Sequence, residues 1–237
     1  MMAPVAPLNI FIGYDSREPI AFSVLAHSII TRATRPVSIT PLARHTLAGW
    51  YSRERGPTES TEFSLTRFLV PALSQFQGVS IFMDCDMLCR VDITQVLHEV
   101  IAQPDAAVLV CQHQYTPSTT EKFLGQRQTA YPCKNWSSFM VFNNARCQRL
   151  TPAYVHRATG LELHRFTWLD RADQIGSLPL EWNWLIGEYA PNPDAKVWHY
   201  TLGGPWFPES AHCDHAAEWV AERDTMLSAA VVHGAVR

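Results

Sequence analysis

Residues 79–86, Val-Ser-Ile-Phe-Met-Asp-Cys-Asp, join an apolar run to two aspartates. A short apolar run of this kind predicts a buried strand. Side chains alternate in an extended segment, so Asp84 and Asp86 point the same way while Cys85 points back to the core. Two neighbouring carboxylates repel each other unless a cation lies between them. The segment therefore predicts a site for Mn²⁺ or Mg²⁺, although spacing alone is equally compatible with one capping Asp and one surface Asp.

The composition limits the class of protein around this segment. The chain has 237 residues, of which 47% are hydrophobic and 17% charged, so it can form a folded core. Its formal net charge is −3 and its basic residues are scattered, so we expect no nucleic-acid partner. We find no apolar run long enough for a transmembrane segment and no signal peptide. The six cysteines form no CxxC pair, which favours free thiols and a cytoplasmic location.

Apolar runs alternate with segments of helical spacing along the chain. The strand pattern covers 8–12, 39–42, 79–83, 106–111, 138–142 and 196–199. The helix pattern covers 22–29, 63–76, 94–102, 145–158 and about 212–230. This alternation predicts one α/β domain over residues 1–237, with a mostly parallel central sheet flanked by helices and a site at the carboxyl edge of the sheet.

Five further motifs, in order along the chain, resemble those of glycosyltransferase family 8. The aspartate segment itself resembles the Asp-x-Asp motif of glycosyltransferases with the GT-A fold. The others are Gly13-Tyr14-Asp15, the segment 66–71 around Arg67, the segment 135–143 with Ser137 and Ser138, Asp173-Gln174 with Leu178-Pro179 and Trp182-Asn183, and the segment 199–206 from His199 to Trp206. Together they span most of the chain.

The resemblance implies a role for each motif in a GT-A-like enzyme. His199 would be the third metal ligand beside Asp84 and Asp86. Arg67 would reach the phosphates and the metal-binding carboxylates, and Asp173 or Gln174 would face the anomeric carbon or orient the acceptor. The remaining residues would contact the nucleotide-sugar donor: Gly13, Tyr14, Asp15, Ser137, Ser138, Gly203 and Gly204.

The chain departs from the family at its C-terminal motif. The family usually has a Lys directly before the Pro-Trp pair, and Gly204 takes that place here. Arg67 or a backbone amide would have to replace this contact with the diphosphate, or donor affinity is low. The chain therefore resembles a divergent branch of the family, and the identity of the donor sugar cannot be carried over.

The resemblance implies metal-dependent transfer of a sugar from a nucleoside diphosphate, expected to be UDP, to a hydroxyl acceptor. The acceptor would be a glycan or a glycolipid precursor, and the transfer would retain the anomeric configuration. Two alternatives stay open. A phosphotransferase of the haloacid dehalogenase type also has Asp-x-Asp after an apolar strand, and a non-catalytic nucleotide-sugar-binding module would account for the missing Lys.

Overall fold

The computed structural model describes residues 6–56, 59–114, 121–122, 126–127 and 133–232. Its main sheet has six strands, and the expectation of a mostly parallel sheet is confirmed. The strand order is β2 (Val37–Ala43), β1 (Leu8–Tyr14), β3 (Val79–Met83), β8 (Phe139–Asn143), β5 (Val108–Cys111) and β9 (Ile175–Leu178). β8 runs antiparallel to both of its neighbours, and the other pairings are parallel.

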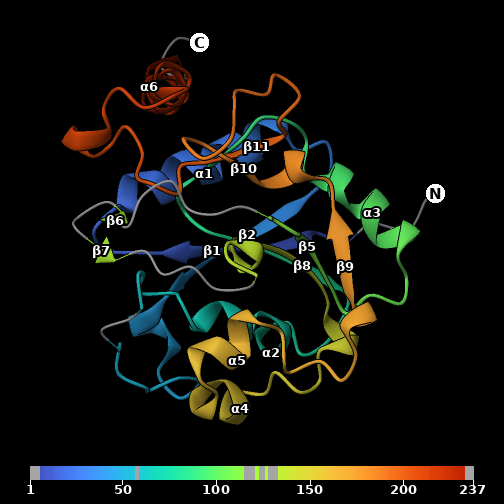
Figure 1. Ribbon diagram of the computed structural model, residues 1–237. Helices are drawn as coiled ribbons and strands as arrows, with labels where there is room; N and C mark the ends of the chain where they lie inside the picture. The colour runs from blue at the N-terminus through green and yellow to red at the C-terminus, as the bar shows by residue number, and fades with distance from the viewer. Residues whose placement is uncertain (1–5, 57–58, 115–120, 123–125, 128–132, 233–237) are drawn as a thin grey trace.

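Helices cover both faces of this sheet (Figure 1). α1 (Pro19–Arg32) lies on one face and packs through Ala21, Val24, Leu25, Ser28 and Ile29. On the other face lie α2 (Val70–Leu73), α4 (Pro152–Arg157) and α5 (Gly160–His164), while α3 (Leu97–Ala102) lies near one end. Burial of apolar side chains between these layers is the main driving force for the fold.

A second, three-stranded sheet was not predicted from the sequence, apart from one of its strands. Its order is β10 (Trp184–Leu185), β11 (Val197–His199) and β4 (Met87–Cys89), with β11 and β4 antiparallel. The register pairs His199 with Met87 and so sets His199 beside Asp86. A further pair of short strands, β6 (Glu121–Lys122) and β7 (Gln126–Arg127), is antiparallel.

Two predicted helices are much shorter in the structure. In the segment 63–76, a 3₁₀ turn at Thr66–Leu69 leads into α2, which ends before Gln75 and Phe76, where φ is positive. Pro71 lies in the first turn of α2, where its missing N–H has no helical partner to lose. In the segment 145–158, α4 begins only at Pro152, after the Thr151 side chain caps it.

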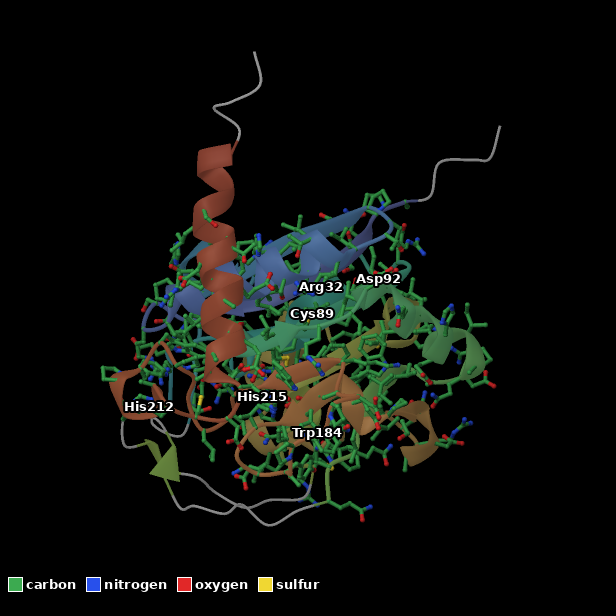
Figure 2. The ribbon with its side chains drawn as sticks, turned by 90° about the horizontal axis from the view of Figure 1, so that it is seen from above. Arg32, Cys89, Asp92, Trp184, His212 and His215 are labelled. Atoms are coloured by element: carbon green, nitrogen blue, oxygen red, sulfur yellow. The ribbon has the colours of Figure 1, made fainter. Side chains whose placement is uncertain are left out.

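The C-terminal helix α6 (Ala216–Val232) begins later than predicted and projects beyond the body of the molecule (Figure 2). Its base is held by Trp219, which is buried in a small apolar cluster with Val24 of α1 and Trp198 of β11. Among the described residues, no helix is both long and apolar enough to cross a membrane. All six cysteines are free, as their spacing predicts.

Candidate metal centre and its surroundings

The predicted ligand set comes together at the carboxyl end of β3. Asp84, Asp86 and His199 each offer one ligand atom, and these atoms all lie within 4.8 Å of one another. The backbone fixes both aspartates: the Asp84 N–H donates to the Ser138 carbonyl, and the Asp86 carbonyl accepts from Tyr200 N–H. Cys85 lies buried between them, as the strand alternation predicts.

The tautomer of His199 follows from a chain of hydrogen bonds. The Asn183 Nδ2 group donates to the Ser138 hydroxyl oxygen and the Asn135 carbonyl, so Asn183 Oδ1 is left as an acceptor. His199 Nδ1 lies 2.9 Å from that oxygen and therefore carries the proton. His199 Nε2 is then free to bind a metal, held in place by the support that metal-binding histidines commonly receive from a second group.

A divalent ion fits this donor set. His199 Nε2 faces Asp86 Oδ1 at 3.3 Å, and a lone pair facing a carboxylate needs a positive charge between them, either a proton or a metal ion. His199 is 2% exposed and Asp86 8%, so water screens the repulsion poorly. Two carboxylates and one imidazole are ligands suited to Mn²⁺ or Mg²⁺.

Arg67, in the 3₁₀ turn that precedes α2, also reaches this cluster. Its Nη1 lies 2.8 Å from Asp84 Oδ1 and 2.9 Å from the Ser137 carbonyl, and its guanidinium lies over the rings of Phe63 and Phe82. The guanidinium thus neutralises one carboxylate and is held rigidly by its neighbours.

Gly13, Tyr14 and Asp15 lie at the carboxyl end of β1. A Cβ atom on Gly13 would lie 2.5 Å from the Phe63 ring, so only glycine allows this packing. Asp15 is fully buried and accepts hydrogen bonds from Arg17 and from Glu62 N–H. Burial raises the pKa of Asp15, but these hydrogen bonds lower it more, so its net pKa lies below the usual value and the group is charged.

Ser137 and Ser138, predicted to contact the donor sugar, are buried with their hydroxyls bound inside the protein. The Ser138 hydroxyl donates to the Asn135 carbonyl and supports Asn183, while the Ser137 hydroxyl lies 2.7 Å from His164 Nδ1. Burial lowers the pKa of His164 to about 3, and the nearby charge of Arg67 acts in the same direction, so His164 is neutral. The Ser137 carbonyl thus holds Arg67, and the Ser138 hydroxyl holds Asn183, the hydrogen-bond partner of His199.

Asp173 and Gln174 are not brought to the metal centre, which corrects the prediction that they face the anomeric carbon. They directly precede β9, and the Gln174 carbonyl accepts from Ala107 N–H, just before β5. The start of β9 lies beside the start of β5, which pairs with Phe142 of β8, and Phe142 in turn pairs with Ser80 near the start of β3. Asp173 and Gln174 therefore lie at the end of the sheet opposite Asp84. Asp173 is 70% exposed there and pairs with Arg171. Their position is set by the 3₁₀ turn Ala172–Gln174, which leads directly into β9 and so holds both residues at the amino end of that strand.

The glycine before the Pro-Trp pair has a steric cause. A Cβ atom on Gly204 would lie 2.0 Å from the Trp206 ring, so no side chain fits there while Trp206 keeps its position. Gly203, its neighbour, has a φ of +113°, which favours glycine for a separate reason. Trp206 is held in turn by Glu18, whose Oε2 accepts from the indole N–H at 3.1 Å.

Glu18 is a buried acid that the sequence did not single out. It is 2% exposed, and its second oxygen lies 3.6 Å from the Sγ atom of Cys85. Cys85 is the residue between Asp84 and Asp86. Burial raises the pKa of Glu18 to about 8, and the charges of Asp86 and Asp15 add to the shift. Glu18 therefore links the loop after β1, the aspartate segment and the C-terminal loop.

Comparison with known proteins places the chain in a family. No family model matches it. It is 44% identical to Protein CDI of Arabidopsis thaliana over 227 residues, which cover 92% of this chain and 86% of that protein. The chain belongs to the family of Protein CDI. An identity of this size over almost the whole length implies the same fold in both proteins.

Solved structures show that the fold is that of GT-A glycosyltransferases. The bifunctional glycosyltransferase WbbM superposes with a TM-score of 0.61 at 16% identity, over 94% of this chain and half of WbbM. GlyE of Streptococcus pneumoniae gives 0.60 at 12% identity, over 97% of this chain and 64% of GlyE. The galactosyltransferase LgtC, in complex with donor and acceptor sugar analogues, gives 0.54 at 11% identity, over 92% of this chain and 96% of LgtC. The chain thus spans half to two thirds of the first two and nearly all of LgtC.

Proposed function

We propose that this protein is a metal-dependent glycosyltransferase that transfers a sugar from a nucleoside diphosphate, UDP in our assignment, to a hydroxyl acceptor with retention of configuration. The observation that carries the proposal is the cluster of Asp84, Asp86 and His199 at the carboxyl end of β3, in a GT-A fold. Membership of glycosyltransferase family 8 and a location in the cytoplasm are part of the proposal. They are supported by the motif order and by the free cysteines.

The proposed chemistry depends on stabilising the leaving diphosphate. A divalent ion supplies a Lewis acid for the phosphate oxygens when bound. Asp84, Asp86 and His199 Nε2 would hold it, and Asn183, which accepts from His199 Nδ1, orients the ring so that Nε2 faces Asp86. Arg67, already beside Asp84, offers a fixed positive charge to the diphosphate.

The fold favours this reading over a phosphotransferase of the haloacid dehalogenase type, because the superposing structures are glycosyltransferases. The non-catalytic binding module is a second candidate. It is favoured by Gly204, where the contact of Trp206 excludes the Lys expected beside the diphosphate. Binding of donor and metal with no transfer or hydrolysis would identify it.

Removal of either metal-site carboxylate tests the proposal. We expect Asp84→Asn and Asp86→Asn each to abolish the rise in melting temperature that UDP and MnCl₂ together give the wild type, because a ligand bound only by the folded state stabilises it. Differential scanning fluorimetry with UDP, MnCl₂ and both together measures this, and titration calorimetry gives the dissociation constants.

Asp173→Asn is the matched control, since Asp173 is an exposed aspartate at the opposite sheet edge. It should bind UDP with metal as the wild type does. Wild-type binding of UDP that is indifferent to metal, or retained by both site variants, would contradict the assignment.

A further inference from the structure

His164, the last residue of α5, is a neutral histidine beside the turn that carries Arg67. Burial and the charge of Arg67 lower the pKa of His164 to about 3, whereas a hydrogen bond with the Ser64 backbone acts to raise it. A bond that raises the pKa favours the protonated form, so the imidazole donates to the Ser64 carbonyl. His164 Nδ1 lies 2.7 Å from the Ser137 hydroxyl oxygen and is therefore the unprotonated nitrogen, which accepts from that hydroxyl.

The contacts of His164 bracket Arg67. Ser64 lies three residues before Arg67, and Phe68 directly follows it. The Phe68 ring meets the His164 ring edge to face, with the ring centroids 5.2 Å apart. The contact with the Ser137 hydroxyl holds the residue whose carbonyl accepts from Arg67 Nη1 at 2.9 Å. One imidazole thus contacts the chain before Arg67, the chain after it and the residue that accepts its hydrogen bond.

The position of the Arg67 guanidinium depends on this support. An arginine side chain has many rotamers, and holding it in one of them costs conformational entropy. Arg67 is 5% exposed, and its Nη1 is shared between Asp84 Oδ1, at 2.8 Å, and the Ser137 carbonyl. A displacement of Ser137 would remove one of these two bonds and let the guanidinium move relative to Asp84. The charge offered to a diphosphate therefore depends on Ser137 as well as on Asp84.

We infer that His164 is a positioning residue for the proposed transfer, and that through Ser137 and Phe68 it holds the Arg67 guanidinium where it binds the leaving diphosphate. This inference rests on the proposed function. Because His164 acts through Arg67, its replacement should weaken binding of a diphosphate and leave binding of the metal ion alone intact.

Replacement of His164 by phenylalanine tests this role. His164→Phe keeps a ring against Phe68 and removes the acceptor of the Ser137 hydroxyl. We expect the dissociation constant for UDP in MnCl₂, measured by titration calorimetry, to rise about tenfold, the lower end of what a hydrogen bond to a charged group contributes. Mn²⁺ alone should bind at least as tightly as to the wild type, because a displaced Arg67 repels the cation less. The EPR signal of free Mn²⁺ measures that affinity, and a general loss of structure would weaken both ligands.

Two further variants separate positioning from folding. Ser137→Ala removes only the hydroxyl and keeps the carbonyl that accepts from Arg67, so it should change UDP and Mn²⁺ binding as His164→Phe does. UDP carries no sugar, so a contact of Ser137 with a donor sugar does not enter the measurement. His164→Asn places an amide oxygen near the position of Nδ1 and should restore most of the UDP affinity. It loses the ring contact with Phe68 and should nevertheless melt at a lower temperature than His164→Phe.

A double-variant cycle tests whether His164 acts through Arg67. Arg67→Ala removes the guanidinium and should weaken UDP binding more than His164→Phe does. Adding His164→Phe to Arg67→Ala should then change the UDP affinity no further, whereas independent effects would multiply.

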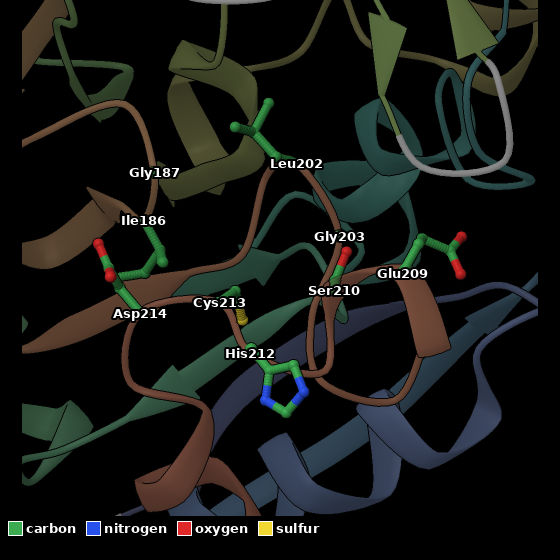
Figure 3. A pocket seen from close by; sticks show the side chains of 9 residues that line it. All are labelled: Ile186, Gly187, Leu202, Gly203, Glu209, Ser210, His212, Cys213 and Asp214. Carbon is green, nitrogen blue, oxygen red and sulfur yellow. The ribbon is translucent and has the colours of Figure 1, made fainter.

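Two matched controls lie outside these contacts. Leu163→Val, one residue earlier on α5, disturbs the buried core and removes no hydrogen-bonding group. His212 is an exposed histidine that lines a cavity together with Ser210 and Cys213 (Figure 3), and His212→Phe makes the same exchange at the surface. Both variants should bind UDP with MnCl₂, and Mn²⁺ alone, as the wild type does.

The outcomes separate the two proposals. A wild type that shows no metal-dependent binding of UDP contradicts the proposed function before any variant is compared. If the wild type binds UDP with metal, and His164→Phe and Ser137→Ala bind it equally well, the role of His164 alone is overturned. A parallel loss of UDP and Mn²⁺ affinity, or a further loss when His164→Phe is added to Arg67→Ala, overturns it as well.

Discussion

The loop after His199 contains a glycine whose replacement would force a tryptophan ring to move. Gly204 lies against the Trp206 ring, and Trp206 is fixed by its hydrogen bond to Glu18 and by contacts with Tyr200 and Trp219. A glycine at this position is therefore a consequence of the packing of Trp206, whose indole occupies the space that a Cβ atom would need.

Gly204→Ala should therefore destabilise the protein by about 1–3 kcal/mol, the usual cost of overpacking. In a Trp206→Ala background the same change should cost little, so the two sites should show a strong coupling energy. Urea unfolding of the four proteins measures this. Gly203→Ala is the control, because its penalty comes from a φ of +113° and should be similar in both backgrounds. Additive effects of Gly204→Ala and Trp206→Ala would refute the steric account.

The sequence could indicate the candidate metal ligands but not the residues that orient them. Asp84, Asp86 and His199 belong to motifs with fixed residue types, and the structure brings them together. Asn183 and Glu18 act through partners far away in sequence, which no local pattern reveals. Asn183 belongs to the Trp182-Asn183 pair, which resembles a family motif and so pointed to this residue. No sequence pattern pointed to Glu18, which directly precedes α1.

At the scale of elements, strands were easier to predict than helices. β1, β3, β5 and β8 are buried apolar runs, which the pattern identifies, whereas β9, Ile-Gly-Ser-Leu with an exposed serine, was not predicted. The segment 63–76 has helical spacing because its apolar residues fill the core, yet only one α turn forms before the chain reverses at Gln75 and Phe76. Tertiary packing, which the spacing does not contain, decides such cases.

One carboxylate of α6 forms ion pairs with two side chains of α1. Glu222 is 10% exposed and pairs with His27 at 2.7 Å and with Arg32 at 2.7 Å, both on α1. Burial raises the pKa of Glu222, but the hydrogen bonds from Arg32 and His27 lower it further, so the net pKa lies below the ordinary value of 4.5. A lowered pKa means that this stabilisation is present above pH 4.5 and is lost as pH falls through the folded-state pKa.

Glu222→Gln should lower the free energy of unfolding by about 1 kcal/mol at pH 7, a figure reduced for the partial exposure of Arg32. The difference from the wild type should shrink below pH 4.5, as measured by urea unfolding from pH 7 to pH 4. Glu218→Gln is the matched control on the same helix, because its carboxylate is 52% exposed and pairs only with His215 three residues earlier among the ion pairs described. Equal losses for the two variants at pH 7 would show that α6 does not dock through Glu222.

At the scale of the whole molecule, the sequence predicted the layers but not the way the C-terminal third closes on the site. Alternating strands and helices predict an α/β sheet with its site at the carboxyl edge. The small sheet is different, because β4 and β10 are too short to show a pattern and form only by pairing with β11. That pairing is what sets His199 beside Asp86.

The closed arrangement brings carboxylates together, since Glu18 lies buried near Asp86 and Asp15. Its burial, and then the charges of these two aspartates, raise the pKa of Glu18 to about 8. Because the pKa of Glu18 is raised, the stability contribution linked to this group is fully present below the ordinary value of 4.5. That contribution is lost as the pH rises toward 8. Glu18→Gln should therefore stabilise the metal-free protein, with a gain that grows from pH 5 to pH 8. One pKa unit corresponds to about 1.4 kcal/mol, so we expect a gain on the order of 1 kcal/mol or more at pH 8.

Urea unfolding in EDTA at pH 5, 6.5 and 8 measures this gain. Glu18→Ala separates charge from hydrogen bonding, because it also removes the acceptor of the Trp206 N–H and should destabilise the protein at pH 5, where Glu18→Gln is nearly neutral. Gln keeps that acceptor, so Trp206 and the loop at Gly204 stay in place while the buried charge is lost. A Glu18→Gln variant that is less stable than the wild type at pH 8 would mean that the Glu18 charge stabilises the closed molecule, contrary to the repulsion argued from its burial among carboxylates.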